Sequence, residues 1–177
     1  MRTLLLSSFL LLACRGKTDT APPEKASPAA PAAKPSAPAA GPHVDACAVL
    51  TKAEVEALVG KPVTDGHKEE AAELSVCVYG NPEMPMLGGR PTDIHLSLGV
   101  FSGSAPGQAR GVYDIAKNNA GKPQEVSGLG EVAFWDNSPR TLRAVKGNHM
   151  VDLTIGSDLG GLKTAQAIAA KTLAKLP

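Results

Sequence analysis

The sequence predicts an α+β fold, in which an antiparallel sheet of about six to seven strands packs with about three helices. The first observation is a two-residue hairpin turn at 147–148, which sets Arg143 opposite Asp152 and leaves an apolar row on the other strand face. The second is the alternation of apolar residues from Asp93 to Phe101. The third is the helical spacing of apolar residues from Gly160 to Leu176.

The first helix and the segments after it follow from local signals. Thr51 and Glu54 form a T-x-x-E capping box, so a helix is expected from there to Gly60. A short strand is expected at 62–64. The charged segment 67–74 is expected to be a connection, which could form a helical turn.

The remaining elements complete the sheet. Alternating residues predict strands at 74–79 and 131–136, and a second helix is expected at 106–119. Its inner face is expected to contain Val112, Ile115 and Ala116. Both early helices end in Gly-Lys-Pro, at 60–62 and 121–123, so the chain could contain an αβββ internal repeat, or simply two independent helix ends.

The N-terminus predicts an export signal. An apolar run from Leu4 to Leu12 follows Arg2, and it is far too short for the roughly 20 residues of a transmembrane helix. Ala13 then precedes Cys14, after which the sequence becomes polar. This ending resembles the lipobox of bacterial lipoproteins. The resemblance implies that 1–13 is a signal peptide and that Cys14 becomes the first residue and carries acyl chains, palmitate among them; the alternative is an ordinary signal peptide with a chance cysteine.

Acylated Cys14 would hold the protein on a lipid bilayer, because each buried methylene contributes about 0.8 kcal/mol. Arg15 stands where an Asp tends to retain enteric lipoproteins at the inner membrane. We therefore expect an exported protein of the cell envelope, at the outer membrane (on its periplasmic or surface face) rather than the inner membrane.

Residues 14–43 are expected to be a disordered tether. Between 15 and 43, seven residues are Pro, nine are Ala, and none is Val, Ile, Leu, Phe, Trp or Tyr. Such a segment cannot bury enough apolar area to offset its ordering entropy, and its prolines favour extended polyproline II. A single folded domain is expected at 44–177.

Two cysteines remain, Cys47 and Cys77. An even count in an exported domain predicts a disulfide, which would close a loop of about 30 residues and stabilise the fold by roughly 3.5 kcal/mol. The rival interpretation is a metal site with His67, His95 or His149. No short ligand spacing such as C-x-x-C supports it.

The sequence argues against several function classes. Residues 44–177 contain 13 basic and 15 acidic side chains, a net charge of −2, which does not fit a nucleic-acid binder. Gly128-Leu129-Gly130 precedes a strand and is expected to be a turn, and GSAPG at 103–107 lacks the serine of a nucleophile elbow. His95 is expected on the outward strand face, as a surface or helix-covered residue. We therefore predict no catalytic residue, cofactor or metal, and a non-enzymatic protein.

One loop, NPEMPMLGGRP at 81–91, contains two Met and a Leu. Met84, Met86 and Leu87 either fold back over the core or form a binding lip, with Trp135 as an anchor. The first functional hypothesis is a protein-interaction or envelope-assembly module, which needs an exposed apolar patch. The second is a tethered carrier or sensor of a small apolar ligand, which needs an enclosed cavity between sheet and helix.

Four short stretches follow a known pattern: DACAVLTKAEVEALVGKPV, CVYG, GLGEVAFW and VKGNHMVDLTI. Together they resemble a group of exported bacterial lipoproteins with a domain of unknown function, whose members show D-x-C-x-L-L-T, C-x-Y, G-L-G-D-E-A-Y-W and a K-G-D hairpin. Val49, Glu131-Val132 and Phe134 depart from this pattern. The resemblance implies a Cys47–Cys77 disulfide and an α+β fold, and it implies no activity.

Overall fold

The structure is a computed structural model that describes residues 42–177. The signal peptide at 1–13, the lipid attachment at Cys14 and nearly all of the tether at 14–43 lie outside the described residues and stay predictions. Among the helices of the described part of the chain, none is long and apolar enough to cross a membrane.

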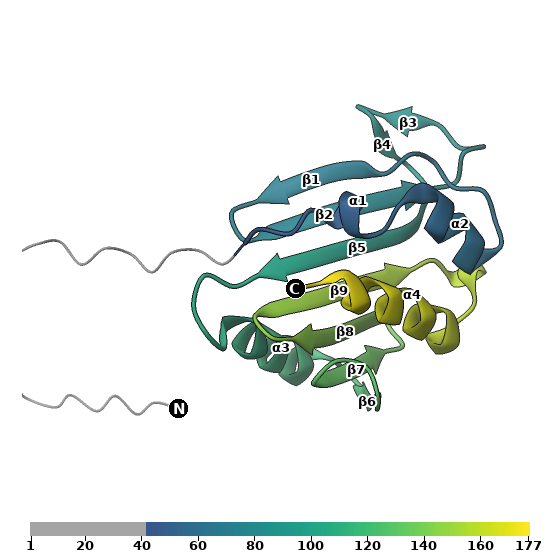
Figure 1. Cartoon of the computed structure of the whole chain (residues 1–177). Helices are drawn as coiled ribbons and strands as arrows, with labels where there is room; N and C mark the ends of the chain where they lie inside the picture. The colour runs from purple at the N-terminus through teal and green to yellow at the C-terminus, as the bar shows by residue number, and fades with distance from the viewer. Residues whose placement is uncertain (1–41) are drawn as a thin grey trace, which may run out of the picture. The chain divides into compact units, whose positions relative to one another are not determined.

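A seven-stranded antiparallel sheet forms the centre of the described chain, in the order β1-β2-β5-β9-β8-β7-β6 (Figure 1). Its strands are β1 (His67–Ala71), β2 (Leu74–Gly80), β5 (Ile94–Ser102), β6 (Gln124–Glu125), β7 (Val132–Asp136), β8 (Thr141–Lys146) and β9 (His149–Ile155). A separate two-stranded hairpin consists of β3 (Met86–Leu87) and β4 (Arg90–Pro91). The helices are α1 (Ala46–Val49), α2 (Lys52–Val59), α3 (Gln108–Asn119) and α4 (Leu162–Lys175), with a 3-10 turn η1 (Ser157–Leu159) before α4. The predicted α+β fold is confirmed.

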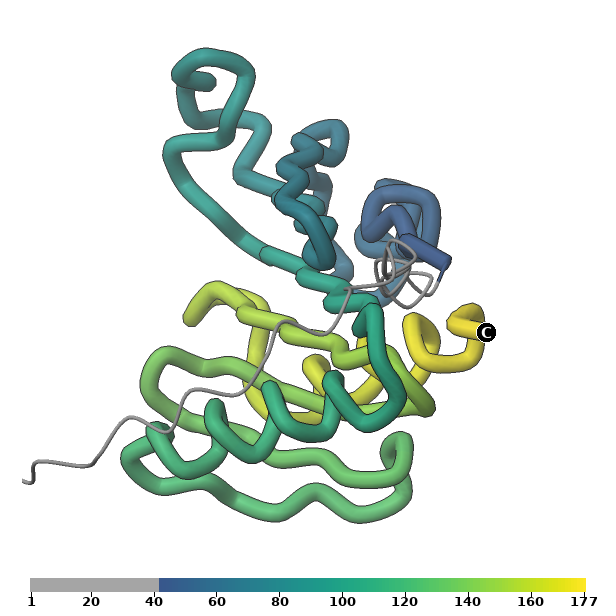
Figure 2. The backbone as a smooth tube through the Cα atoms, turned by 90° about the vertical axis from the view of Figure 1, so that its left-hand side faces the viewer, coloured from purple at the N-terminus to yellow at the C-terminus, as the bar shows by residue number. Residues whose placement is uncertain are grey.

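The larger core lies on the sheet face that α1, α2 and α4 cover. Leu98 of β5, Leu142 of β8 and Leu153 of β9 are fully buried there. The buried stripe of α4 has the predicted helical spacing and consists of Ala165, Ile168, Ala169, Thr172 and Leu173. In Figure 2 the N-terminal helices and α4 lie side by side. Segments from the two ends of the described chain therefore close one core.

Helix α3 covers part of the opposite sheet face. Tyr113 packs edge-on against Phe134, with ring centroids 5.2 Å apart. The smaller core comprises Ala109, Tyr113, Phe134, Val145 and Met150. The prediction that Ile115 faces inward is wrong, since 64% of the residue is exposed. The aromatic contact sets the rotation of the helix, and Ile115 follows Tyr113 by two residues, about 200° around the axis.

The predicted β8–β9 register is confirmed. Arg143 pairs with Asp152 across the hairpin, and the guanidinium Nε donates to a carboxylate oxygen at 2.7 Å. On the other face of the same strands, Ala144 and Val151 are fully buried. One turn thus places an ion pair under α3 and an apolar row under α4.

The segment after α2 differs from the prediction. Residues 62–64 form no strand, although the Thr64 N–H donates to the Gly80 carbonyl at 3.0 Å. The expected connection at 67–74 is instead mostly strand β1, paired with β2 from His67 opposite Val78. The charged residues of β1 are typical of a loop, which is why the sequence did not predict a strand here. Charged residues are also common on edge strands, where they discourage pairing with other chains.

A disulfide joins Cys47 to Cys77, which excludes both thiols as metal ligands and confirms the predicted bridge. Cys47 lies on α1, a short helix that the sequence analysis missed. The Asp45 side chain caps this helix by accepting from the backbone N–H of Cys47 at 2.9 Å. Since Cys77 lies on β2, the bridge ties the start of the domain to the sheet.

Helices α2 and α4 are joined by ion pairs. The predicted capping box of Thr51 and Glu54 is present at the start of α2. The Lys175 ammonium of α4 lies 2.7 Å from Glu54 Oε1. This contact and the backbone N–H of Thr51 lower the pKa of Glu54 to about 2. The same carboxylate therefore caps one helix and binds the end of another.

The strand order has an internal symmetry. Strands β1, β2 and β5 lie in this order from one edge to the sheet centre, and β6, β7, β8 and β9 lie in this order from the other edge. Apart from the two-residue edge strand β6, each half contains three strands, as an αβββ repeat requires, although β1 stands in the first half in place of the predicted strand at 62–64. The helices do not follow it, because α2 and α3 cover opposite sheet faces.

The Gly128–Gly130 segment is a turn, as expected. Gly128 and Gly130 have φ values of 75° and 64°. A Cβ on Gly128 would meet no atom within 4 Å, whereas a Cβ on Gly130 would lie 2.3 Å from the Val145 carbonyl oxygen. That oxygen accepts from the Glu131 N–H at 2.7 Å. The close approach of Gly130 to β8 therefore belongs to the hydrogen bonding between this segment and the sheet.

Gly130→Ala is therefore expected to destabilise the protein more than Gly128→Ala. Both substitutions carry the cost of about 1–2 kcal/mol for a left-handed residue with a Cβ. Gly130→Ala also forces the turn away from β8, for which we expect about 2 kcal/mol more. Urea unfolding of the full-length variants measures the difference. Equal free energies of unfolding for the two variants would show that the turn can move away from β8 without loss of stability.

Candidate functional site

The predicted binding lip lies on the β3–β4 hairpin, which projects beyond the sheet (Figure 1). Met84 and Met86 are each 46% exposed, and Leu87 is 77% exposed. They therefore do not fold back over the core, which was the alternative interpretation. Trp135 is only 3% exposed and belongs to the larger core on β7, near the other sheet edge. Met84, Met86 and Leu87 are therefore exposed on one connection of the chain, and Trp135 is not part of the predicted lip.

The hairpin is held by one polar contact beside its tip and one at its base. The Arg90 guanidinium Nε lies 2.7 Å from a carboxylate oxygen of Glu69 on β1. The Thr92 hydroxyl donates to the Pro85 carbonyl at 2.7 Å. A cleft of about 400 Å³ separates the hairpin from the 63–67 segment, and Met86 lines it. The apolar tip is therefore positioned while its side chains stay in solvent.

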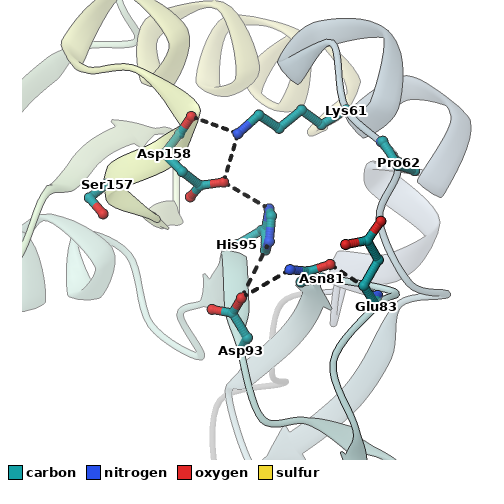
Figure 3. A pocket seen from close by; sticks show the side chains of 8 residues that line it. All are labelled: Lys61, Pro62, Asn81, Glu83, Asp93, His95, Ser157 and Asp158. Atoms are coloured by element: carbon teal, nitrogen blue, oxygen red, sulfur yellow. Dashed lines mark hydrogen bonds and ion pairs between the residues drawn. The ribbon is translucent and has the colours of Figure 1, made fainter.

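A polar cavity of about 480 Å³ lies at one end of the central strands (Figure 3). Its lining comes from four chain segments and comprises Lys61, Pro62, Asn81, Glu83, Asp93, His95, Ser157 and Asp158. His95 lies between two carboxylates: its Nδ1 is 3.3 Å from Asp158 Oδ2 and its Nε2 is 3.7 Å from Asp93 Oδ2. We call this the polar cavity.

Lys61 completes the charge arrangement of the polar cavity. Its ammonium donates to the Asp158 carboxylate at 3.0 Å and to the Asp158 carbonyl at 3.1 Å. Burial raises the pKa of Asp158, but the bonds from Lys61 and its own backbone N–H, together with the nearby His95, outweigh burial, so the pKa lies below its ordinary value. Asp158 therefore stays ionised at neutral pH.

Gly156 allows η1 to approach β5 closely at this cavity. Its N–H donates to the His95 carbonyl at 2.6 Å. A Cβ at this position would lie 2.7 Å from Asp158 Oδ1 and 3.2 Å from the His95 carbonyl oxygen. The absence of a side chain at residue 156 thus allows Asp158 to sit beside His95.

A smaller, apolar cavity of about 210 Å³ lies between the sheet and α3. Its lining comprises Leu74, Val76, Ser97, Gly99, Phe101, Val112, Met150 and Asp152. Val112 is its lining residue from α3, and the other residues come from β2, β5 and β9. We call this the apolar cavity.

The comparisons with known proteins identify a family. The family model described as "Protein of unknown function (DUF3558)" matches residues 9–134. The chain belongs to the DUF3558 family. No curated protein matches the chain. Among solved structures, the extracellular domain of PknH from Mycobacterium tuberculosis is similar at 16% identity and a TM-score of 0.42, over 72% of this chain and 92% of that one.

The DUF3558 domain assembles titratable groups that sequence spacing did not predict to converge. His95 was expected to be a surface or helix-covered residue; the surface alternative is wrong, since His95 is only 7% exposed and the 3-10 turn η1 packs beside it. Ser157 lines the same cavity, but among the hydrogen bonds of residues 42–177 none joins its hydroxyl to His95. The arrangement can bind a charged group, and it does not form a Ser–His–Asp chain.

The other histidines have separate environments. His149 Nδ1 lies 3.1 Å from the Ser102 hydroxyl, and burial lowers the pKa of His149. His67 Nε2 lies 3.9 Å from Glu69 on the edge strand β1. Within residues 42–177, no group of three or more His, Cys, Asp or Glu side chains is arranged to hold a metal ion.

Gly156→Ala is expected to separate η1 from β5 in this DUF3558 domain. The added Cβ displaces the Asp158 carboxylate, so the ring NMR signals of His95 should shift and the free energy of unfolding should fall by about 1–2 kcal/mol. Gly121→Ala is the matched control, because a Cβ there meets no atom within 4 Å. Unchanged His95 signals in Gly156→Ala would contradict the described packing.

Proposed function

We propose that this DUF3558 protein is an exported bacterial envelope lipoprotein, anchored through Cys14, that acts as a non-enzymatic protein-interaction module. The partner is another envelope protein, and the β3–β4 hairpin is the contact surface. The observation that carries the proposal is the exposure of Met84, Met86 and Leu87 on one hairpin outside the main sheet.

The exposure of these side chains supports a role in binding. Apolar area in water costs about 25 cal/mol per Å², a cost that contact with a partner would remove. Nearby, Arg90 and Glu69 form an ion pair that gives the apolar tip a polar rim. An apolar centre with a polar rim is the usual anatomy of a protein interface. Methionine adds adaptability, because its unbranched side chain can fit partners of different shape.

The N-terminal sequence supports the anchor. The apolar run 4–12, Ala13 and Cys14 stand in the order of a lipobox. A Pro- and Ala-rich stretch then separates Cys14 from the folded domain, which would give the hairpin reach beyond the bilayer surface. Arg15 favours the outer membrane where the cell has one.

A second candidate function is a tethered carrier or sensor of a small apolar ligand. The apolar cavity between the sheet and α3 favours it, because Phe101, Val112 and Met150 line it. Its volume of about 210 Å³ is below the roughly 300–1,000 Å³ that is usual for ligand sites. The hairpin is therefore the stronger candidate.

Cys14→Ser is expected to release the protein from the membrane. The substitution removes the sulfur that would carry lipid, and with it the burial of the acyl chains, at about 0.8 kcal/mol per methylene. Fractionation of the expressing cells, with mass spectrometry of the mature N-terminus, measures the outcome. Ala26→Ser serves as the control, since it introduces the same side chain after Cys14 and leaves residues 1–14 and the disulfide intact. A Cys14→Ser protein that stays in the membrane fraction would exclude a lipid anchor.

The triple variant Met84→Ser, Met86→Ser, Leu87→Ser is expected to lose its partner and keep its stability. We expect a Tm within about 2 °C of the native chain, since surface substitutions change stability by about 0.5 kcal/mol or less. Partner contact is measured by a photo-crosslinker at residue 82 in intact cells. Ile115→Ser, which removes another exposed apolar side chain, is the control and should keep the crosslink.

Two outcomes would contradict the interaction module. A Tm lowered by more than about 5 °C in the triple variant would show that Met84, Met86 and Leu87 stabilise the fold by packing against the core. An identical crosslink in the native and triple variants would exclude the hairpin as the contact. An apolar adduct in native mass spectra of the native chain, with no crosslink, would favour the carrier.

A further inference from the structure

We propose that the polar cavity binds a small organic molecule through a primary ammonium group, with the carboxylates of Glu83 and Asp93 as acceptors. This inference goes beyond the proposed function, because the cavity is distinct from the lip formed by Met84, Met86 and Leu87. It rests on the charges in the cavity, on the environment of His95 and on the way the walls are held.

The charges in the cavity are not balanced. The one ammonium in the lining, that of Lys61, is bound to Asp158 through both its carboxylate and its carbonyl. Among the ion pairs of residues 42–177, Glu83 takes part in none, and Asp93 has only His95, at 3.7 Å. Two carboxylates therefore face the cavity without a bound cation. An ammonium group would match them, because charge-assisted hydrogen bonds to carboxylates are among the strongest in proteins.

His95 supplies an independent observation. The residue is more than nine-tenths buried and lines the cavity, and its buried Nδ1 forms no hydrogen bond, although Asp158 Oδ2 lies 3.3 Å from it. Buried polar atoms are rarely left without a hydrogen bond in proteins, and a functional role or a bound molecule is one explanation for those that are. In Figure 3 the ring lies between Asp158 and Asp93, the second of which is one of the two proposed acceptors. A cation at this position would reorient these carboxylates and complete the hydrogen bonding of the ring.

The walls of the cavity are held in place before any ligand arrives. Asn81 Nδ2 donates to Asp93 Oδ2 at 3.3 Å, and the Glu83 N–H donates to Asn81 Oδ1 at 3.0 Å. Asn81 thus fixes the distance between the loop that carries Glu83 and the start of β5. On the opposite wall, the N–H of Gly156 donates to the His95 carbonyl. A preorganised site loses less conformational entropy on binding.

The cavity suits an organic cation better than a metal ion. Its volume of about 480 Å³ lies in the range of small-molecule sites and is far larger than a single ion needs. Within the described residues, no three acidic, His or Cys side chains converge as metal ligands do. Asn81 and Ser157 add neutral hydrogen-bonding groups for the rest of the molecule.

The test uses the full-length chain in detergent and 1,5-diaminopentane as the probe, at neutral pH. Binding is followed by the ring NMR signals of the four histidines, His43, His67, His95 and His149. We expect a saturable shift of the His95 signals and no comparable shift from the uncharged 1,5-pentanediol. In the variant Glu83→Gln/Asp93→Asn, we expect binding at least about tenfold weaker, since both charged acceptors are lost.

The control variant Glu70→Gln/Asp114→Asn removes the same charge from exposed carboxylates on β1 and α3, and it should bind as the native chain does. Equal affinity of Glu83→Gln/Asp93→Asn and the native chain would overturn the proposal, as would the absence of any His95 shift. A shift with CaCl2 and none with the diamine would assign the cavity to a metal ion and likewise overturn it. The anchor and the hairpin contact are measured separately, so their failure would leave this result standing.

Discussion

The pairing of β5 with β9 at the sheet centre is the contact on which the rest of the structure depends. It joins the half of the sheet built from β1, β2 and β5 to the half built from β6 to β9. Its register sets Leu98 opposite Leu153, so that the buried rows of both halves meet under α4. The same register sets Leu96 opposite Ile155, which brings η1 beside the start of β5. Both the larger core and the polar cavity are consequences of this pairing.

The β2–β5 connection contributes to both proposed sites. Asn81 and Glu83, at its start, line the polar cavity, and Met84 and Met86 follow directly on the chain. A bound cation at Glu83 would therefore hold the base of the hairpin that we propose as the partner surface. This gives the two proposed sites a short physical connection, through the backbone of three residues.

The stabilising contacts are concentrated away from both sites. The Cys47–Cys77 bridge, the ion pair between Glu54 and Lys175 and the packing of Tyr113 on Phe134 fix the N-terminal helices, α4 and α3. The hairpin contributes no residue to either core. An exposed hairpin on a well-packed sheet can change its sequence with little loss of stability, which suits the recognition role that we propose for it.

The sequence alone was sufficient for the elements that depend on local signals. The capping box at Thr51, the stripe of α4 and the register of the β8–β9 hairpin were predicted because each depends on residues close together in the chain. Edge strand β1 was missed, since its charged residues mimic a loop until a neighbouring strand pairs with them. The disulfide between Cys47 and Cys77 was predicted from cysteine count and from resemblance.

Only the tertiary structure decided the environment of individual side chains. Residues 61, 83, 93, 95 and 158 meet because the β5–β9 pairing and Gly156 bring distant segments together, and no local pattern encodes such convergence. Trp135 is separated from the lip by the width of the sheet for the same reason. The sequence by itself predicted an export signal, which stays a prediction, and determined the alternation of strands, because both are properties of neighbouring residues. The polar cavity and the exposed lip depend on long-range packing, so they became visible only in the folded chain.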